Sequence, residues 1–226
     1  MQSEFDGLRN IRSALAFLVI SQVLLEAGAV FLLFLFFAED VTYVLVGGLI
    51  ILVAFSLYFL SLAKFRSGFK LLRSFYKHLG IGYLGVNVII TGYALIPLLI
   101  LYDIHMVTSN VVGTFNLQLA LPPIFYLFNA LVALVPALGN ILMMLGVYRI
   151  GNTYNEANVR VGGMLIIVGS ILSIAEMPIE IYGYLVAPNF ILPAIIIAVS
   201  LFVANSVLFF IGALLAYQGL SKILRK

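Results

Sequence analysis

Six long apolar runs separated by short gaps constrain the fold of this chain more than any other feature. All six are longer than 20 residues, enough for an α-helix to cross a hydrocarbon core of about 30 Å at about 1.5 Å per residue. A water-soluble fold of this size cannot bury so much apolar surface, since 64% of the residues are hydrophobic and only 9% are charged. We therefore predict an all-α transmembrane bundle that forms a single domain over residues 1–226, with spans near residues 13–37, 41–63, 80–102, 122–148, 161–185 and 191–217.

The basic residues predict the orientation of the bundle. All twelve lie at the chain ends or in alternate gaps between the predicted spans: Arg9, Arg12, Lys64, Arg66, Lys70, Arg73, Lys77, Arg149, Arg160, Lys222, Arg225 and Lys226. Because cytoplasmic loops of membrane proteins carry an excess of Lys and Arg, we expect both termini and the loops at 64–79 and 149–160 to be cytoplasmic. The net charge of +3 then needs no acidic partner, and we expect no binding of nucleic acid.

A short repeat connects two of the cytoplasmic gaps. The second and fourth spans end with an aromatic residue, an arginine and a glycine, and a glycine pair seven residues apart opens each following span: Phe65-Arg66-Ser67-Gly68 with Gly85 and Gly92, and Tyr148-Arg149-Ile150-Gly151 with Gly162 and Gly169. Both units cross the membrane in the same direction, so a duplication would give parallel repeats around an axis along the membrane normal. Alternatively, these residue types are simply common at helix ends that face the cytoplasm, and both interpretations stay open.

Four sequence blocks resemble those of a known family. They are residues 8–14 (LRNIRSA), 66–70 (RSGFK), 80–85 (GIGYLG) and 146–155 (GVYRIGNTYN). They are similar to the conserved blocks of an archaeal family of small integral membrane proteins, domain-of-unknown-function nine-seven-three, which is typical of Sulfolobus-type archaea. The resemblance covers most of the chain apart from the outer loop at 103–121. It implies a multi-pass protein of the archaeal plasma membrane and brings no activity, ligand or site residue.

The cytoplasmic loop at 64–79 combines an apolar stripe with a cationic one. At 100° per residue, the stripe of Phe65, Phe69, Leu72, Tyr76 and Leu79 lies about 100° from the basic side chains. This pattern predicts a helix in the membrane interface, with its rings toward acyl chains and its cations toward headgroups, where each cation adds about 1 kcal/mol of attraction to an anionic surface. The predicted lipid or partner interface is Lys64, Arg66, Lys70, Arg73 and Lys77; alternatively, these charges only set the topology.

Three polar residues are expected in the outer half of the membrane: Glu26, Asn129 and Glu176. An ionised side chain inside hydrocarbon costs at least about 2.5 kcal/mol, so each acid there is a candidate for function. Glu26 and Glu176 belong to different spans and would face each other or share a cation. Alternatively, Glu176 reaches the headgroups through the local break that Pro178 makes in its helix.

Three asparagines are expected nearer the cytoplasm: Asn87, Asn140 and Asn205. They belong to three different spans and would form a hydrogen-bonded cluster between helices. Such contacts are worth about 1 kcal/mol or less each, so helix packing is the simpler interpretation. Alternatively, the three asparagines line a substrate pathway.

No catalytic, cofactor or metal site is predicted. The chain has no cysteine, and its sequence contains no phosphate-binding loop, nucleophile elbow or paired-histidine motif. His78 is expected inside and His105 outside, so the thickness of the membrane prevents them from sharing one metal ion or haem. We therefore expect a protein that is not an enzyme; because membrane enzymes can work with dispersed Asp and Asn side chains, a membrane enzyme stays open as a third alternative.

Two functions follow from these features. The first is an accessory or scaffold subunit that binds membrane lipids and the helices of partner subunits or of a second copy. The second is a small transporter or channel that uses Glu26, Asn129 and Glu176.

Overall fold

The computed structural model describes residues 2–38, 41–111, 123–185 and 191–225, and within these ranges the chain forms six long helices, one short 3₁₀ helix and no strand. The helices are α1 (Gln2–Ala38), α2 (Val41–Phe75), η1 (Lys77–Leu79), α3 (Gly80–Val111), α4 (Pro123–Thr153), α5 (Ala157–Leu185) and α6 (Ile191–Ile223). Each of the six long helices is long and apolar enough to cross a membrane. The predicted all-α bundle with six spans is therefore confirmed.

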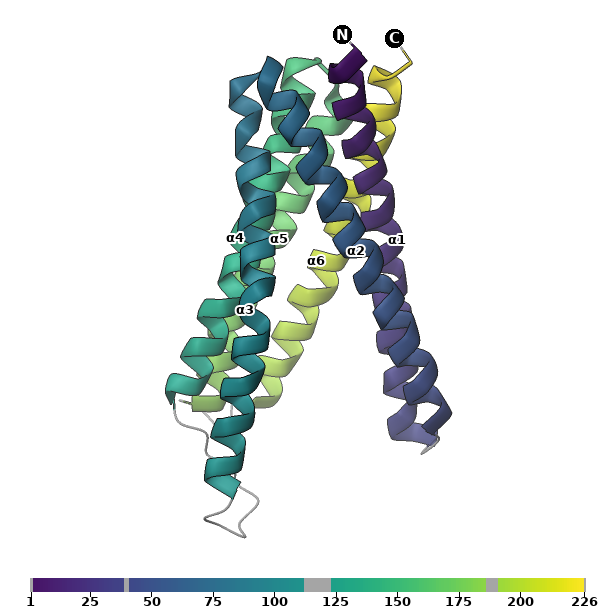
Figure 1. Ribbon diagram of the computed structural model, residues 1–226. Coiled ribbons are helices and arrows are strands. Elements are labelled where there is room, and N and C mark those ends of the chain that lie inside the picture. The colour runs from purple at the N-terminus through teal and green to yellow at the C-terminus, as the bar shows by residue number, and fades with distance from the viewer. Residues whose placement is uncertain (1, 39–40, 112–122, 186–190, 226) are drawn as a thin grey trace.

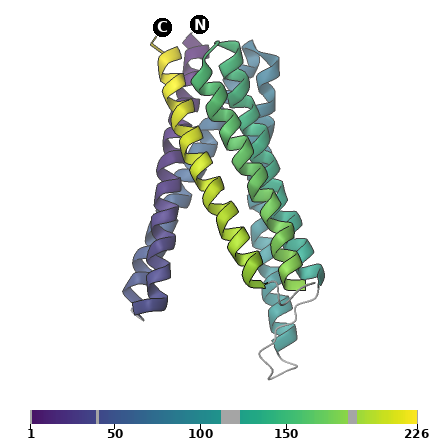
Figure 2. The same ribbon diagram turned by 180° about the vertical axis from the view of Figure 1, so that it is seen from behind.

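The helices form two groups that are joined at one end and diverge toward the other (Figure 1). Helices α1 and α2 pack against each other as a pair, and α3, α4, α5 and α6 pack in sequence as the second group. The pair contacts the second group through α1 with α6 and through α2 with α3. Seen from behind, α6 runs beside α1 at the joined end and diverges from it toward the other (Figure 2).

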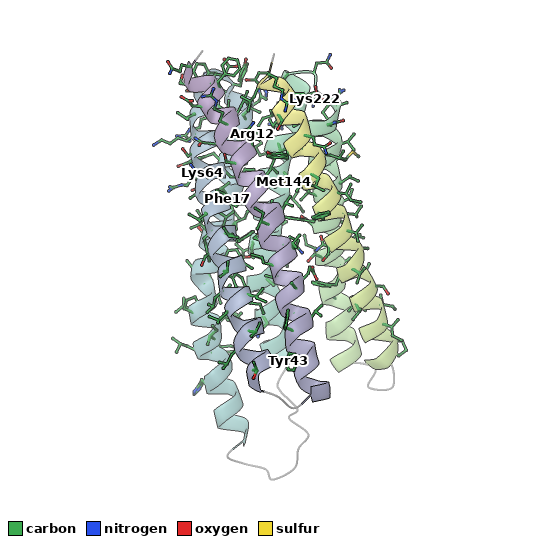
Figure 3. The ribbon with its side chains drawn as sticks, turned by 90° about the vertical axis from the view of Figure 1, so that its right-hand side faces the viewer. Arg12, Phe17, Tyr43, Lys64, Met144 and Lys222 are labelled. Atoms are coloured by element: carbon green, nitrogen blue, oxygen red, sulfur yellow. The ribbon has the colours of Figure 1, made fainter. Side chains whose placement is uncertain are left out.

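Both chain ends, η1 and the turn between α4 and α5 lie at the joined end, which we call the basic end (Figure 1). Arg12 and Lys222 lie there and Tyr43 lies at the opposite end (Figure 3). The gaps that carry the Lys and Arg residues are thus on one side of the bundle, as the charge pattern predicts. Which side of the membrane this is remains a prediction.

The helices extend beyond the predicted spans. Helix α1 starts at Gln2 rather than at residue 13, and α3 continues through the first part of the predicted outer loop to Val111. Hydropathy marks only the part of a helix that contacts hydrocarbon, so the helical turns outside it, at either end, were missed. The remaining residues of the predicted outer loop, 112–121, lie outside the described part of the chain.

The prediction of an interface helix at 64–79 is wrong. Residues 64–75 continue α2 as one helix, and Phe65, Phe69, Leu72 and Leu79 are fully buried within the bundle instead of facing acyl chains. The stripe has the predicted helical phase, but the early start of α1 places Leu8 and Ile11 in the same buried cluster and so covers it.

Phe69 joins the two helix groups. Its ring stacks on Phe65, with centroids 6.1 Å apart, and reaches Gly82 of α3 and Gly146 of α4. A Cβ atom on Gly146 would lie 2.8 Å from the ring, and one on Gly82 would overlap it. The two glycines therefore make the space that this side chain fills.

Glycines also set the spacing of neighbouring helices in the second group. Gly85 of α3 packs on the backbone of Gly139 and Met143 in α4, and Gly162 of α5 packs on Gly212 and Ala216 in α6. Each of the two glycine pairs of the proposed repeat thus faces the helix that follows its own. Duplication itself stays a prediction, because Gly68 faces α1 whereas Gly151 faces Arg160 of α5.

Adding one methyl group at Gly85 tests this packing. We expect Gly85→Ala to lower the thermal midpoint of the purified protein, because its Cβ would lie 2.6 Å from the oxygen of Gly139 and overlap the backbone at Met143; overpacking of this kind costs about 1–3 kcal/mol. The matched control is Gly48→Ala, whose Cβ meets no atom within 4 Å. Circular dichroism during heating in mild detergent measures both, and equal midpoints for the two variants would contradict the packing.

Single cysteines test the orientation, since the chain has none of its own. We expect a membrane-impermeant maleimide to label His105→Cys in intact cells, and to label Ser3→Cys and Ser74→Cys only after the membrane is permeabilised. The reverse pattern would place the basic end outside.

Candidate functional site

A polar cavity of about 190 Å³ lies between the six helices. Every long helix contributes to its wall: Gln22 from α1, Tyr58 from α2, Tyr93 from α3, Ala137 and Asn140 from α4, Ser170 and Ser173 from α5, and Asn205 and Phe209 from α6. We call it the six-helix cavity. It lies one turn beyond Leu18, Met144 and Ile166 of the buried apolar core.

The cavity is near the middle of the hydrocarbon core. Gln22, Asn140 and Ser170 lie ten, nine and ten residues from Arg12, Arg149 and Arg160 along their respective helices. At about 1.5 Å per residue this is about 15 Å from the basic flank, half of a hydrocarbon core of about 30 Å.

The polar groups of the wall are uncharged amides and hydroxyls, and one of them lacks a partner. Asn140 Nδ2 donates to Ser170 Oγ at 3.4 Å, and Ser170 Oγ donates in turn to the backbone oxygen of Ile166 at 2.9 Å. Asn140 Oδ1 is buried without a hydrogen-bond partner. Exchanging the amide oxygen and nitrogen would leave the NH₂ group in that position instead, so one polar atom of Asn140 needs a further partner in either assignment.

The predicted intramembrane acid Glu26 lies one turn beyond the cavity. Its Oε1 accepts hydrogen bonds from Gln22 Nε2 at 2.9 Å and from Ser206 Oγ at 2.8 Å. Gln22 lines the cavity, and Ser206 follows the cavity residue Asn205 on α6. Glu26 therefore connects α1 to α6 and places a carboxylate beside the uncharged wall.

The structure brings together part of the predicted polar set. Asn140 and Asn205 share the cavity, whereas Asn87 accepts a hydrogen bond from Arg66 Nε at 3.0 Å, closer to the basic end. Asn129 is not among the residues that line the cavity. The side chain of Glu176 lies outside the described part of the structure, so its predicted pairing with Glu26 is not tested.

Five polar residues of the cavity wall were not among the predicted site residues: Gln22, Tyr58, Tyr93, Ser170 and Ser173. Gln22 was recognisable from the sequence as a polar partner of Glu26, because it precedes Glu26 by one helical turn in an apolar run. The sequence does not distinguish the two tyrosines as cavity residues, because a tyrosine in a membrane span can serve equally well in helix packing. Their rings meet edge-on at 5.6 Å and join α2 to α3.

A carboxylate joins the two helix groups at the basic end. Glu4 Oε1 of α1 accepts hydrogen bonds from the hydroxyl of Tyr76, which follows α2, at 3.0 Å and from that of Tyr154, which follows α4, at 2.6 Å. We call these three residues the Glu4 clamp. The hydrogen bond to Glu4 is the main cause that raises the pKa of Tyr76; burial, followed by Glu4, raises the pKa of Tyr154.

Further polar contacts close the basic end around the clamp. Arg149 Nη1 donates to the backbone oxygen of His78 at 2.8 Å, and the His78 ring lies 3.0 Å from Thr153 Oγ1. Lys222 Nζ lies 3.8 Å from Glu156 Oε1, which joins α6 to the turn before α5. The basic end is therefore held by charged and hydroxyl groups as well as by the apolar core.

Within the described residues no group of three or more His, Asp or Glu side chains is placed to hold a metal ion. His78 precedes α3 and His105 lies 27 residues further, near the other end of that helix, about 40 Å away. The two histidines therefore cannot share a ligand within one chain.

A family model described as "Protein of unknown function (DUF973)" matches residues 4–226. No curated protein and no solved structure matches the chain. The match brings no ligand or reaction, so the cavity and its surroundings carry the functional argument.

Replacing Tyr154 by phenylalanine tests the clamp. Because its pKa is raised in the folded state, the protonated hydroxyl stabilises the fold at pH values below the unfolded-state pKa of about 10, and this contribution is lost as the pH rises from there through the folded-state pKa. We expect Tyr154→Phe to lose roughly 1–2 kcal/mol of stability at pH 7 and to approach the wild type above pH 10.

Thermal unfolding between pH 7 and pH 11 measures this difference. The control is Tyr148→Phe on the preceding turns of α4, where no hydroxyl contact is described. A Tyr154→Phe protein as stable as the wild type at pH 7 would show that the clamp contributes nothing.

Proposed function

The chain belongs to the DUF973 family, matched over residues 4–226, and from its six-helix cavity we propose that it transports a small polar solute across a membrane. The single observation that carries the proposal is that every membrane-spanning helix contributes a polar side chain to one cavity near the middle of the hydrocarbon core. Substrate sites of transporters are commonly found at this depth, where helix groups meet.

The cost of these side chains supports a role beyond packing. Burying an uncharged amide or hydroxyl without a full set of hydrogen bonds costs about 1–3 kcal/mol. One turn closer to the basic end the same helices pack with Leu18, Met144 and Ile166, so apolar residues are able to fill the space between them. A bundle that only had to be stable gains nothing from an unpartnered Asn140.

The size and chemistry of the cavity limit the solute. A volume of about 190 Å³ is below the roughly 300–1,000 Å³ of sites for drug-sized ligands. The amides and hydroxyls of the wall both donate and accept hydrogen bonds, and Glu26 adds negative charge on one side. These features favour a small solute with hydrogen-bonding groups that is either neutral or positively charged.

The division of the helices suggests how access would alternate. The pair α1–α2 and the group α3–α6 are held together at the basic end and diverge at the other (Figure 1). Rocking of one group against the other would open the basic end only if the Glu4 clamp separates, since it joins both groups. In this proposal, the arrangement of the helices would be the state that is closed at the basic end.

Solute uptake into proteoliposomes tests the proposal. We expect the reconstituted protein to accelerate the entry of at least one of glycerol, urea or methylammonium over empty liposomes, as followed by stopped-flow light scattering. Asn140→Leu and Asn205→Leu should reduce that rate about tenfold, corresponding to about 1.4 kcal/mol. The matched control is Asn152→Leu, the same substitution at an exposed position near the end of α4.

Two results would contradict the transporter. Either all three solutes enter at the rate of empty liposomes, or the cavity variants behave like Asn152→Leu. If the protein then co-purifies with a second membrane protein after mild detergent extraction, the accessory or scaffold role becomes the better proposal.

A further inference from the structure

A second cavity, of about 330 Å³, lies between the end of α2 and the start of α3. Its wall consists of Ala63, Arg66, Ser67 and Lys70 from α2 and Tyr83 from α3. We call it the α2–α3 groove. It is separate from the six-helix cavity, and the two share no residue.

The groove is strongly cationic. Arg66 and Lys70 lie one helical turn apart on the same face of α2, and the Arg73 guanidinium lies over the ring of Tyr83 at 4.3 Å from its centroid. The two ion pairs within the described residues, Arg9 with Asp6 and Lys222 with Glu156, involve none of these three cations. An anion in the groove would therefore meet positive charge that no acidic side chain of this part of the chain compensates.

Arg66 is held in a position that suits an anion. Its Nε donates to Asn87 Oδ1 at 3.0 Å, and its guanidinium lies 5.8 Å from the centroid of the Tyr83 ring. Tyr83 is also a side-chain hydrogen-bond partner of Arg66. Together these contacts hold the guanidinium at the wall of the groove, where its remaining N–H groups can donate to a further acceptor. Two parallel hydrogen bonds from an arginine match the oxygens of a phosphate.

The position of the groove at the end of an apolar span favours the phosphate of a lipid over a free phosphate ion. Ala63 is the last residue of the second predicted apolar span, and the cations follow it directly. On the membrane side of the groove, one turn before Ala63 on α2, Leu60 is 51% exposed, which suits contact with an acyl chain. A phospholipid places its phosphate and its acyl chains in this order, whereas a free phosphate ion makes no use of the exposed leucine.

We propose that the α2–α3 groove binds the headgroup of one anionic phospholipid, with Arg66 and Lys70 contacting its phosphate and Arg73 adding charge from the next turn. Because α2 and α3 belong to different helix groups, the lipid would lie on the joint between them. The buried aromatic stripe makes this arrangement possible: α2 continues past the membrane and carries its cations at headgroup level. The proposal does not depend on transport.

Short-chain lipids test the groove on the full chain in an uncharged detergent. We expect dihexanoyl phosphatidylglycerol to raise the thermal midpoint in a concentration-dependent way, and dihexanoyl phosphatidylcholine and inorganic phosphate to have little effect at the same concentrations. The double variant Arg66→Gln with Lys70→Gln should weaken the apparent Kd for phosphatidylglycerol at least tenfold. The matched control, Lys64→Gln with Lys77→Gln, removes the same charge from the same end but not from the groove.

The other outcomes overturn the proposal. An equal shift with inorganic phosphate would indicate a site for free anions, and an equal shift with phosphatidylcholine would show that headgroup charge plays no part. An equal loss of affinity in the control variant would assign the effect to general surface charge. If the double variant does not fold, Lys70→Gln alone serves the same comparison, because Lys70 is exposed and has no described hydrogen bond or ion pair.

Discussion

The ring of Phe69 holds the two helix groups together, and much of the molecule depends on where it sits. It enters a space that Gly82 and Gly146 leave open, so α2 approaches α3 and α4 at the basic end. Beside Phe69, the backbones of α1 and α2 also approach closely, since a Cβ atom on Gly68 would lie 2.8 Å from the backbone oxygen of Gly7. Contacts of this kind need backbones that approach closely, which is how helices associate when lipid offers no hydrophobic driving force between them. The far ends of the two groups have no such joint and diverge.

The joint also determines where polar groups are tolerated. On its basic side lie hydroxyl and charged contacts such as the Glu4 clamp, which water is able to reach. On its other side lies the six-helix cavity, near the membrane midplane, where Glu26 and Asn140 must find partners within the protein. The apolar core thus separates two polar regions of different solvation, and a path from one side of the membrane to the other would have to pass through it.

The spans and the common end of the cations were predictable, because length, hydropathy and charge are properties of each segment by itself. The phase of the stripe at 64–79 was also correct, but its environment was not. Whether Phe65 and Phe69 meet lipid or protein depends on Leu8 and Ile11 of α1, which lie more than 50 residues earlier. The same limit applies to the cavity. Glu26 was recognisable from its charge alone, whereas Tyr58 and Tyr93 become cavity residues only through the rotation of α2 and α3, which side-chain packing decides. Asn87 was predicted from its depth in the membrane to join the other two asparagines, but it accepts a hydrogen bond from Arg66 instead.

The Glu4 clamp has a consequence for the order of assembly during synthesis. Glu4 lies in the first turn of α1, and its shorter hydrogen bond is to Tyr154, 150 residues later. At about 5–20 residues per second, roughly 8–30 s pass between the synthesis of the two residues. During this time α1 and α2 are able to insert as a hairpin through their own close contact, while α1 still lacks its attachment to the rest of the bundle. Helix α1 therefore enters the membrane before the other five long helices described here but is attached to the rest of the bundle late, and α6, which packs beside it, is synthesised later still.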